Sequence, residues 1–167
     1  FYTDILKINA ALVGTMFLVA RAVDAFTDTI MGRIADKVKA GKGGKFKPWL
    51  IRMCGPVALA SFLMYQTSMA EASMTVRIIY MFTTYLFWGS ICYTAINIPY
   101  GSMASVMSAE ADDRAALSTF RGVGSLFSGM LIGVVLPMFL YKTLEDGTQV
   151  ANAELFPIVT LICSVAA

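Results

Sequence analysis

The chain has 167 residues, of which 57% are hydrophobic and 14% are charged, with a formal net charge of +2 and no histidine. Soluble globular domains average about 45–50% apolar and about 25% charged residues, so this balance excludes an ordinary soluble domain and favours a polytopic membrane protein. The lack of histidine excludes histidine-based catalysis and histidine metal sites, and we expect neither a cofactor nor a nucleic-acid partner.

Five hydrophobic segments follow one another along the chain, and each predicts a membrane-crossing helix. They cover residues 9–32, 48–69, 76–105, 115–141 and 155–167, the last of which is truncated. Short polar connections separate them, which favours a packed all-α bundle spanning 1–167 with no separate soluble domain. Because the sequence starts at Phe1 and stops at Ala167 inside an apolar run, we expect a segment of a longer chain.

The distribution of Lys and Arg predicts the orientation of this bundle. The first connection carries most of the basic residues, Arg33, Lys37, Lys39, Lys42, Lys45 and Lys47. Such loops remain on the cytoplasmic side of the membrane, so the first helix is predicted to run inward from an external Phe1. The acidic connection 108–114 then falls on the same side as the basic one. These features indicate a multi-pass membrane protein.

The first segment contains Arg21, Asp24 and Asp28, which lie on one face of a helix because they are three and four residues apart. Each charge at mid-bilayer costs about 2.5–3.5 kcal/mol, whereas a Leu, Ile, Phe or Val returns only about 0.3–0.6 kcal/mol. A helix that served only as an anchor would not carry three such charges. The face therefore predicts a functional site inside the membrane.

Asp24 and Asp28 cannot both stay ionised at low dielectric without a counter-charge. A monovalent cation, a shared proton or Arg21 one turn earlier would each supply it, and the Thr27 hydroxyl adds an oxygen of the kind that hard cations prefer. The alternative is a purely structural Arg–Asp salt bridge, which would leave one aspartate unpaired. We therefore favour a monovalent-cation site, with Arg21 as a tuning partner.

The third segment places Tyr93, Thr94, Asn97 and Pro99 close together. Thr94 and Asn97 share a helix face, and Pro99 removes a backbone hydrogen bond, so the segment suits a polar solute cavity. The alternative is an ordinary kink with interhelical hydrogen bonds. Arg121 in the fourth segment offers a rigid donor fork for sugar hydroxyls or a carboxylate, or else extends to the inner interface.

Three strings together resemble one known family. GTMFLVARAVDAFTDTIMGRIADKVKAGKGGKFKPWL, CYTAINIPYGSM and STFRG are similar to the glycoside–pentoside–hexuronide:cation symporters, the melibiose permease-like group of the major facilitator superfamily. The resemblance covers essentially the whole chain. It implies about four and a half helices of the N-terminal six-helix bundle, from the second of twelve into the sixth. The first helix and the C-terminal half would then be partners supplied by the rest of the protein.

The resemblance also implies residue roles. Asp24 and Asp28 match cation-binding aspartates, with Thr94 near them and Thr27 where another oxygen ligand stands. Tyr93 and Arg121 match polar residues of the family's sugar cavity, and Asn97 stands where melibiose permease has a sugar-binding aspartate. Gly32 and Asp36, with the basic loop, match a cytoplasmic gating motif.

The expected function is therefore alternating-access symport of a sugar, glycoside or hexuronide with sodium, lithium or a proton. Two alternatives remain at this point: a membrane sugar sensor that does not transport, and a related lipid or lysolipid carrier on the same fold. An intramembrane enzyme is the weakest interpretation, because two aspartates on one helix are poorly placed to act on a shared substrate.

Overall fold

The structure is a computed structural model that describes residues 1–39, 44–143 and 149–166. Helix α1 (Ala10–Lys37) is followed by α2 (Lys47–Met64) and the short 3-10 helix η1 (Thr67–Glu71). A continuous helical rod follows, built from α3 (Met74–Leu86), the π-helical η2 (Phe87–Tyr93) and α4 (Thr94–Met107). A second rod consists of α5 (Ala111–Met130), the π-helical η3 (Leu131–Val135) and α6 (Leu136–Leu140). Strands β1 (Tyr141–Thr143) and β2 (Gln149–Ala151) and helix α7 (Leu155–Ala166) complete the chain.

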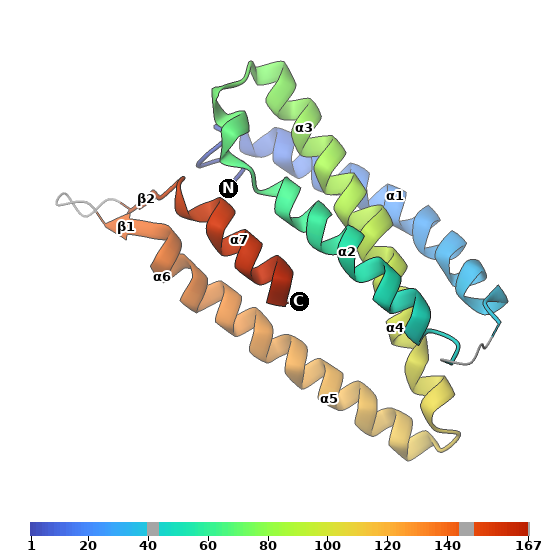
Figure 1. Ribbon diagram of the computed structural model, residues 1–167. Coiled ribbons are helices and arrows are strands. Elements are labelled where there is room, and N and C mark those ends of the chain that lie inside the picture. Colours follow the sequence, from blue (N-terminus) through green and yellow to red (C-terminus); the bar gives the residue numbers. More distant parts are fainter. Residues whose placement is uncertain (40–43, 144–148, 167) are drawn as a thin grey trace.

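Helices α1 and α2 pack against the α3–η2–α4 rod, and α7 packs against α2. The second rod lies across from this group in Figure 1 and meets it where α4 turns into α5. The main core cluster lies at the end that holds the N-terminus, where Tyr2, Leu6 and Ile8 pack with Met16, Met64 and Met81. Arg77 ties this end together by donating to the carbonyls of Ala72 (2.8 Å) and Leu6 (3.0 Å).

Helix ends differ from the predicted segments where a helix extends beyond its apolar part. Helix α1 continues past Gly32 to Lys37, and α5 starts at Ala111, four residues before the predicted segment. These additional turns contain charged residues, such as Arg33 and Asp112. Because charged residues lower the local hydropathy, the predicted apolar segments are shorter than the helices. The second segment is not one continuous helix, because α2 ends at Met64 and the 3-10 helix follows. The antiparallel β1–β2 pair, with Tyr141 opposite Ala151, was not predicted.

Among the described residues, three helical stretches are long and apolar enough to cross a membrane, by length and composition: Ala10–Lys37, Lys47–Glu71 (α2 with the 3-10 helix η1) and Ala111–Leu140. Leu155–Val165 is apolar but shorter. The rod Met74–Met107, which covers the third predicted segment, is not among these three stretches. Polar residues such as Thr94 and Asn97 interrupt its apolar sequence. Many large apolar side chains are exposed, including Phe120 and Leu126 at 77%, as suits a lipid-facing or helix-facing surface.

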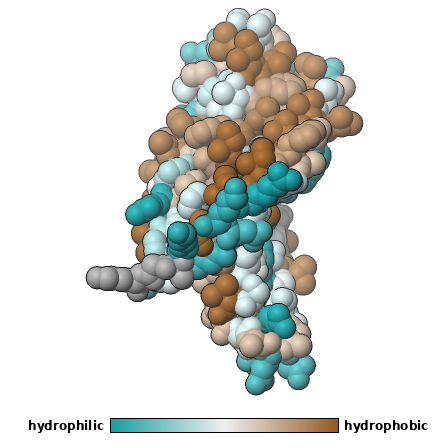
Figure 2. All heavy atoms as spheres, turned by 90° about the vertical axis from the view of Figure 1, so that its right-hand side faces the viewer, coloured by the Kyte–Doolittle hydropathy of each residue, from teal (hydrophilic) through white to brown (hydrophobic). Residues whose placement is uncertain are grey.

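The ends of the molecule differ in polarity. The end of α1, the start of α2 and the connection between α4 and α5 lie at the same end of the molecule, away from the N-terminus (Figure 1). Figure 2 views the molecule from the right-hand side of Figure 1. It shows hydrophobic side chains over the upper part of this face and hydrophilic side chains gathered below. This arrangement agrees with the predicted topology in placing these helix ends on one side of the membrane, and the cytoplasmic location of that side stays a prediction. Lys42 of the basic connection lies outside the described residues.

A hydrogen bond at the opposite end gives a pH-dependent prediction. The Tyr141 hydroxyl donates to Asp4 Oδ2 (2.9 Å), and this bond holds the pKa of the Asp4 carboxyl below its usual range. A depressed carboxyl pKa stabilises the fold above the unfolded-state pKa, and this stabilisation is lost as the pH falls. Tyr141→Phe should lower the unfolding free energy at neutral pH by about 1 kcal/mol or less. Thermal unfolding of wild type and variant at neutral pH and near pH 3 checks this, and an equal difference at both pH values would contradict it.

Candidate functional site

Two parallel helical stretches place their polar residues opposite each other. Ser90 in η2 donates to Asp24 Oδ1 at 2.5 Å, and Thr94 at the start of α4 donates to Asp28 Oδ1 at 2.9 Å. Both pairs are 66 residues apart in the sequence, so the two hydroxyls and the two carboxylates have the same four-residue spacing. Ser90 is 1% exposed and Thr94 5%. The result is a cluster of hard oxygen atoms between α1 and the α3–η2–α4 rod.

Arg21 contributes the positive charge of this cluster. Its Nη1 lies 3.6 Å from Asp24 Oδ2, while most of its own side chain is exposed. The salt bridge of the structural alternative is therefore present, and it engages Asp24. Asp28 instead accepts its bond from the neutral Thr94 hydroxyl. Two carboxylates with one guanidinium leave one negative charge, which a monovalent cation or a proton would neutralise.

A cavity of about 290 Å³ adjoins the cluster. Its wall is formed by polar and aromatic residues of α1 and the first rod, namely Arg21, Asp24, Asp28, Tyr85, Trp88, Gly89, Tyr93, Thr94 and Asn97. Trp88 and Tyr93 stack at a ring-centroid separation of 5.5 Å. Aromatic rings with polar tips provide both an apolar face and a hydrogen-bonding edge. The cavity can thus hold a small ion together with part of a polar ligand.

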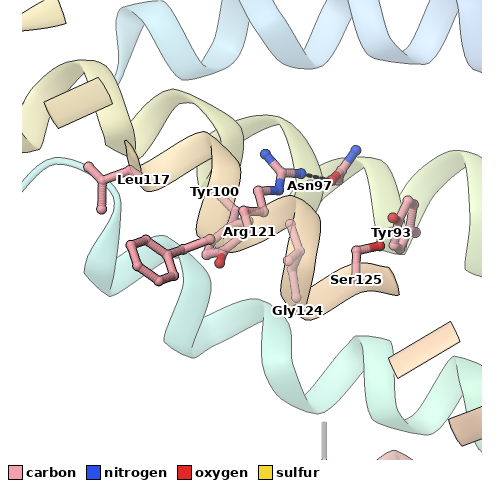
Figure 3. Close-up of a pocket in the computed structure, with 9 residues that line it drawn as sticks. Tyr93, Asn97, Tyr100, Leu117, Arg121, Gly124 and Ser125 are labelled. Carbon is pink, nitrogen blue, oxygen red and sulfur yellow. Dashed lines mark hydrogen bonds between the residues drawn. The ribbon is translucent and has the colours of Figure 1, made fainter. Parts of the chain in front are cut away.

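A larger and more open cavity of about 620 Å³ lies between α4 and α5 (Figure 3). Arg121 Nη2 donates to Asn97 Oδ1 at 2.8 Å across this cavity, and the guanidinium lies 4.8 Å from the Tyr100 ring centroid. A Cβ at Gly101 would lie 3.2 Å from Arg121 Nη1, so a larger residue there would have to move the guanidinium. Arg121 is held toward α4 and does not extend away along its own helix. The remaining lining is Tyr93, Ile96, Leu117, Phe120, Gly124 and Ser125.

Tyr93 and Asn97 line both cavities. A ligand that contacts Asn97 from the larger cavity would therefore touch a residue that also lines the cavity beside the oxygen cluster. The side chains on the two sides differ in chemistry, with carboxylates and hydroxyls on one side and a guanidinium with aromatic rings on the other. A ligand in either cavity would thus contact the same two residues, Tyr93 and Asn97.

Three predicted site residues lie elsewhere. The Thr27 hydroxyl donates to the backbone carbonyls of Val23 and Asp24, both at 3.2 Å, and Thr27 does not line the cavity beside the carboxylates. Gly32 and Asp36 lie near the end of α1, where Lys45 Nζ donates to the Asp36 carbonyl at 3.4 Å. They adjoin the basic connection and are separate from the two cavities. Their gating role stays a prediction.

Several residues of the site were missed by the sequence reasoning. Ser90 lies in the apolar string FWGSICY and attracts no attention by composition. Its signal was the four-residue spacing to Thr94, which repeats the spacing of Asp24 to Asp28. Tyr85, Trp88 and Tyr100 have no comparable polar pattern. They reach the cavities because the rod turns their rings toward α1 and α5.

A helical membrane bundle with paired carboxylates beside a polar cavity is typical of membrane transport proteins. The profile of the family described as MFS/sugar transport protein matches residues 1–166. The chain belongs to this family, and so to the cation/glycoside symporters of the major facilitator superfamily. Its family is one of transporters and not of enzymes.

Individual relatives agree with this assignment. The inner membrane symporter YicJ of Escherichia coli is 40% identical over 81% of this chain and 29% of its own length. A glucuronide carrier protein homologue of Escherichia coli is 31% identical over 99% of this chain and 35% of its own length. The isoprimeverose transporter of Lactiplantibacillus pentosus is 32% identical over 100% of this chain and 34% of its own length. The chain thus spans about a third of the length of these relatives.

Proposed function

We propose that the chain forms part of the N-terminal six-helix bundle of a symporter that moves a sugar, glycoside or hexuronide with a monovalent cation. The transporter would work by alternating access in the inner (plasma) membrane, with the first helix and the C-terminal half contributed by the rest of the protein. The names of the relatives support this class, since they include a glucuronide carrier homologue and an isoprimeverose transporter. The observation that carries the proposal is the wall shared by the two cavities.

The cation is a transported species and binds at the oxygen cluster. Asp24 and Asp28 supply the charge, and the Ser90 and Thr94 hydroxyls supply neutral oxygens at 2.5 and 2.9 Å from them. Sodium or lithium would accept these oxygens as ligands, whereas a proton would be shared between the carboxylates. Arg21 offsets part of the negative charge, which weakens ion binding enough for release.

The sugar binds in the larger cavity against Asn97, Arg121 and Tyr93. The Asn97 amide and the Arg121 guanidinium offer donors and an acceptor for hydroxyls, and the guanidinium also pairs with the carboxylate of a hexuronide. Ion binding neutralises the carboxylates beside Asn97 and fixes the helix that carries Thr94. The sugar then meets an organised site, which gives a coupling free energy that is the same for both ligands.

The test uses the full-length transporter that carries this segment. Purified protein in vesicles should accumulate a glycoside or hexuronide when an inward sodium or proton gradient is imposed, and should exchange the sugar in counterflow without a gradient. Calorimetry at fixed pH should show tighter sugar binding when the coupling ion is added. Sugar binding without counterflow would indicate a sensor and contradict the proposal. Transport of lysolipid with no sugar binding would contradict it as well.

A further inference from the structure

Trp49 makes a hydrogen bond that joins the start of α2 to α4. It lies in the first turn of α2, directly after the basic connection, and is half-buried. Its indole Nε1 donates to the backbone carbonyl of Ala95 in α4 at 2.8 Å. The bond joins residues 46 positions apart. It therefore links the start of α2 to the helix that carries the proposed sugar and ion ligands.

The Ala95 carbonyl is available because of Pro99. In an α-helix, the carbonyl of residue 95 accepts from the amide of residue 99, and a proline there has no N–H to donate. Pro99 is fully buried and Ala95 is 7% exposed, so water has little access to this carbonyl. A buried carbonyl without a donor is costly. The Trp49 indole N–H replaces the donor that Pro99 removes.

This bond lies within the binding helix of the site. Ala95 directly follows Thr94, which donates to Asp28, and Asn97 lies between Ala95 and Pro99 in the sequence. Helix α2 also packs against η2 and α4. A change in the contact between Trp49 and Ala95 would thus shift the backbone between Thr94, the proposed ion ligand, and Asn97, the proposed sugar ligand. Displacements of less than 1 Å are enough to disturb a binding constellation of this kind.

We propose that Trp49 is a positioning residue: its indole N–H satisfies the Ala95 carbonyl freed by Pro99 and so holds Thr94 and Asn97 in their binding arrangement. This proposal rests on the proposed symport function for its transport readout. The structural pairing itself is independent of what is transported. Trp49 lines neither of the two cavities, so its effect on the site would pass through α4.

The test is a double-mutant cycle in the full-length transporter. Trp49→Phe keeps an aromatic ring and loses the N–H, and should raise the KM for sugar about tenfold while the maximal rate changes less than threefold. Pro99→Ala restores a backbone donor to the Ala95 carbonyl and should change the KM about twofold or less. In the Pro99→Ala background, Trp49→Phe should then have an effect of about twofold or less. Rescue by a backbone donor within α4 would identify the carbonyl as the shared partner.

Tyr80→Phe is the matched control. Like Trp49, Tyr80 donates from its side chain to a backbone carbonyl of a neighbouring helix, in this case that of Leu63 in α2. Tyr80 lines neither cavity of the site. The control should leave the KM for sugar within twofold. An equal effect of Trp49→Phe in both backgrounds would contradict the proposal, because it would assign the effect to ring packing. No effect of Trp49→Phe in the wild-type background would contradict it too.

A second readout does not depend on transport. With nitrogen-15-labelled tryptophan, the indole proton resonance assigned to Trp49 should shift upfield in Pro99→Ala, because the backbone amide restored at position 99 competes for the carbonyl. Melting temperatures of the four proteins in detergent should show the same non-additivity as the KM values. If the wild-type protein transports no sugar, the symport proposal fails, while these two measurements still decide whether Trp49 replaces the missing donor. An unchanged resonance together with additive melting temperatures would overturn the pairing.

Discussion

Asp28→Asn is expected to abolish ion-stimulated sugar accumulation while leaving the protein folded. The substitution keeps the size and one oxygen of the side chain, so the bond that Thr94 donates at 2.9 Å can persist. It removes one of two negative charges beside the single guanidinium of Arg21. The oxygen cluster then has no net charge, and a monovalent cation has no electrostatic reason to bind there. Uptake driven by an imposed ion gradient is the measurement.

Two comparisons test whether Asp28→Asn affects ion coupling and not charge or sugar binding in general. Asp112→Asn removes a carboxylate of the same kind from the exposed first turn of α5, away from both cavities, and should leave uptake within twofold. Asp28→Asn should still bind sugar in calorimetry, but with an affinity that added sodium or a change of pH no longer alters. Uphill accumulation at the wild-type level in Asp28→Asn would contradict the assignment of the cation site.

The oxygen cluster of Asp24, Asp28, Ser90 and Thr94 could be predicted in part, and there is a physical reason why Ser90 could not. Charges inside an apolar helix are visible in any sequence, so Asp24 and Asp28 are found from insertion cost alone. Ser90 is not found in this way, because a single serine in a membrane helix costs little. Its role depends on which residue faces it, and that depends on the parallel packing of α1 with the rod. Packing of this kind is a tertiary property.

The π-helical segment also limited what could be predicted about the third segment. The rod changes to π-helical hydrogen bonding over Phe87–Tyr93 and returns to α-helix at Thr94. Because a π-helical turn holds more residues than an α-helical turn, side chains before and after this segment do not follow one 100° progression. A helical wheel for the whole segment 76–105 thus misplaces its aromatic residues relative to Thr94. It places Thr94 and Asn97 correctly, since both lie in α4.

For Arg121, the structure decides between two directions of the side chain that the sequence left open. By sequence, Arg121 could extend to the inner interface or point into a cavity. Its bond to Asn97 and its position over Tyr100 favour the second arrangement. The small side chain at Gly101 leaves the space that this requires. None of these neighbours is close to Arg121 in the sequence, so the choice could not be made from the fourth segment alone.

Arg121→Ala is expected to weaken sugar binding by one to two orders of magnitude and to leave ion binding nearly unchanged. Hydrogen bonds to a charged group contribute about 1.5–3 kcal/mol, and each 1.4 kcal/mol is about tenfold in affinity. Arg121→Lys should recover only part of the loss, because an ammonium keeps the charge but lacks the planar donor fork. Sugar affinity by calorimetry at saturating sodium is the measurement, with the sodium affinity determined separately in the absence of sugar.

Arg114→Ala provides the matched comparison on the same helix. Arg114 is exposed and donates to the carbonyls of its own turn, Glu110 and Ala109, both at 3.3 Å, so its removal should leave sugar affinity within twofold. Two patterns would contradict the role of Arg121. Equal losses in both variants would assign the effect to the general charge of α5, and a loss of sodium affinity equal to the loss of sugar affinity would assign it to the ion cluster. A selective loss for hexuronides over neutral glycosides would add that the guanidinium binds a carboxylate, since hydroxyl recognition alone would weaken both substrates alike.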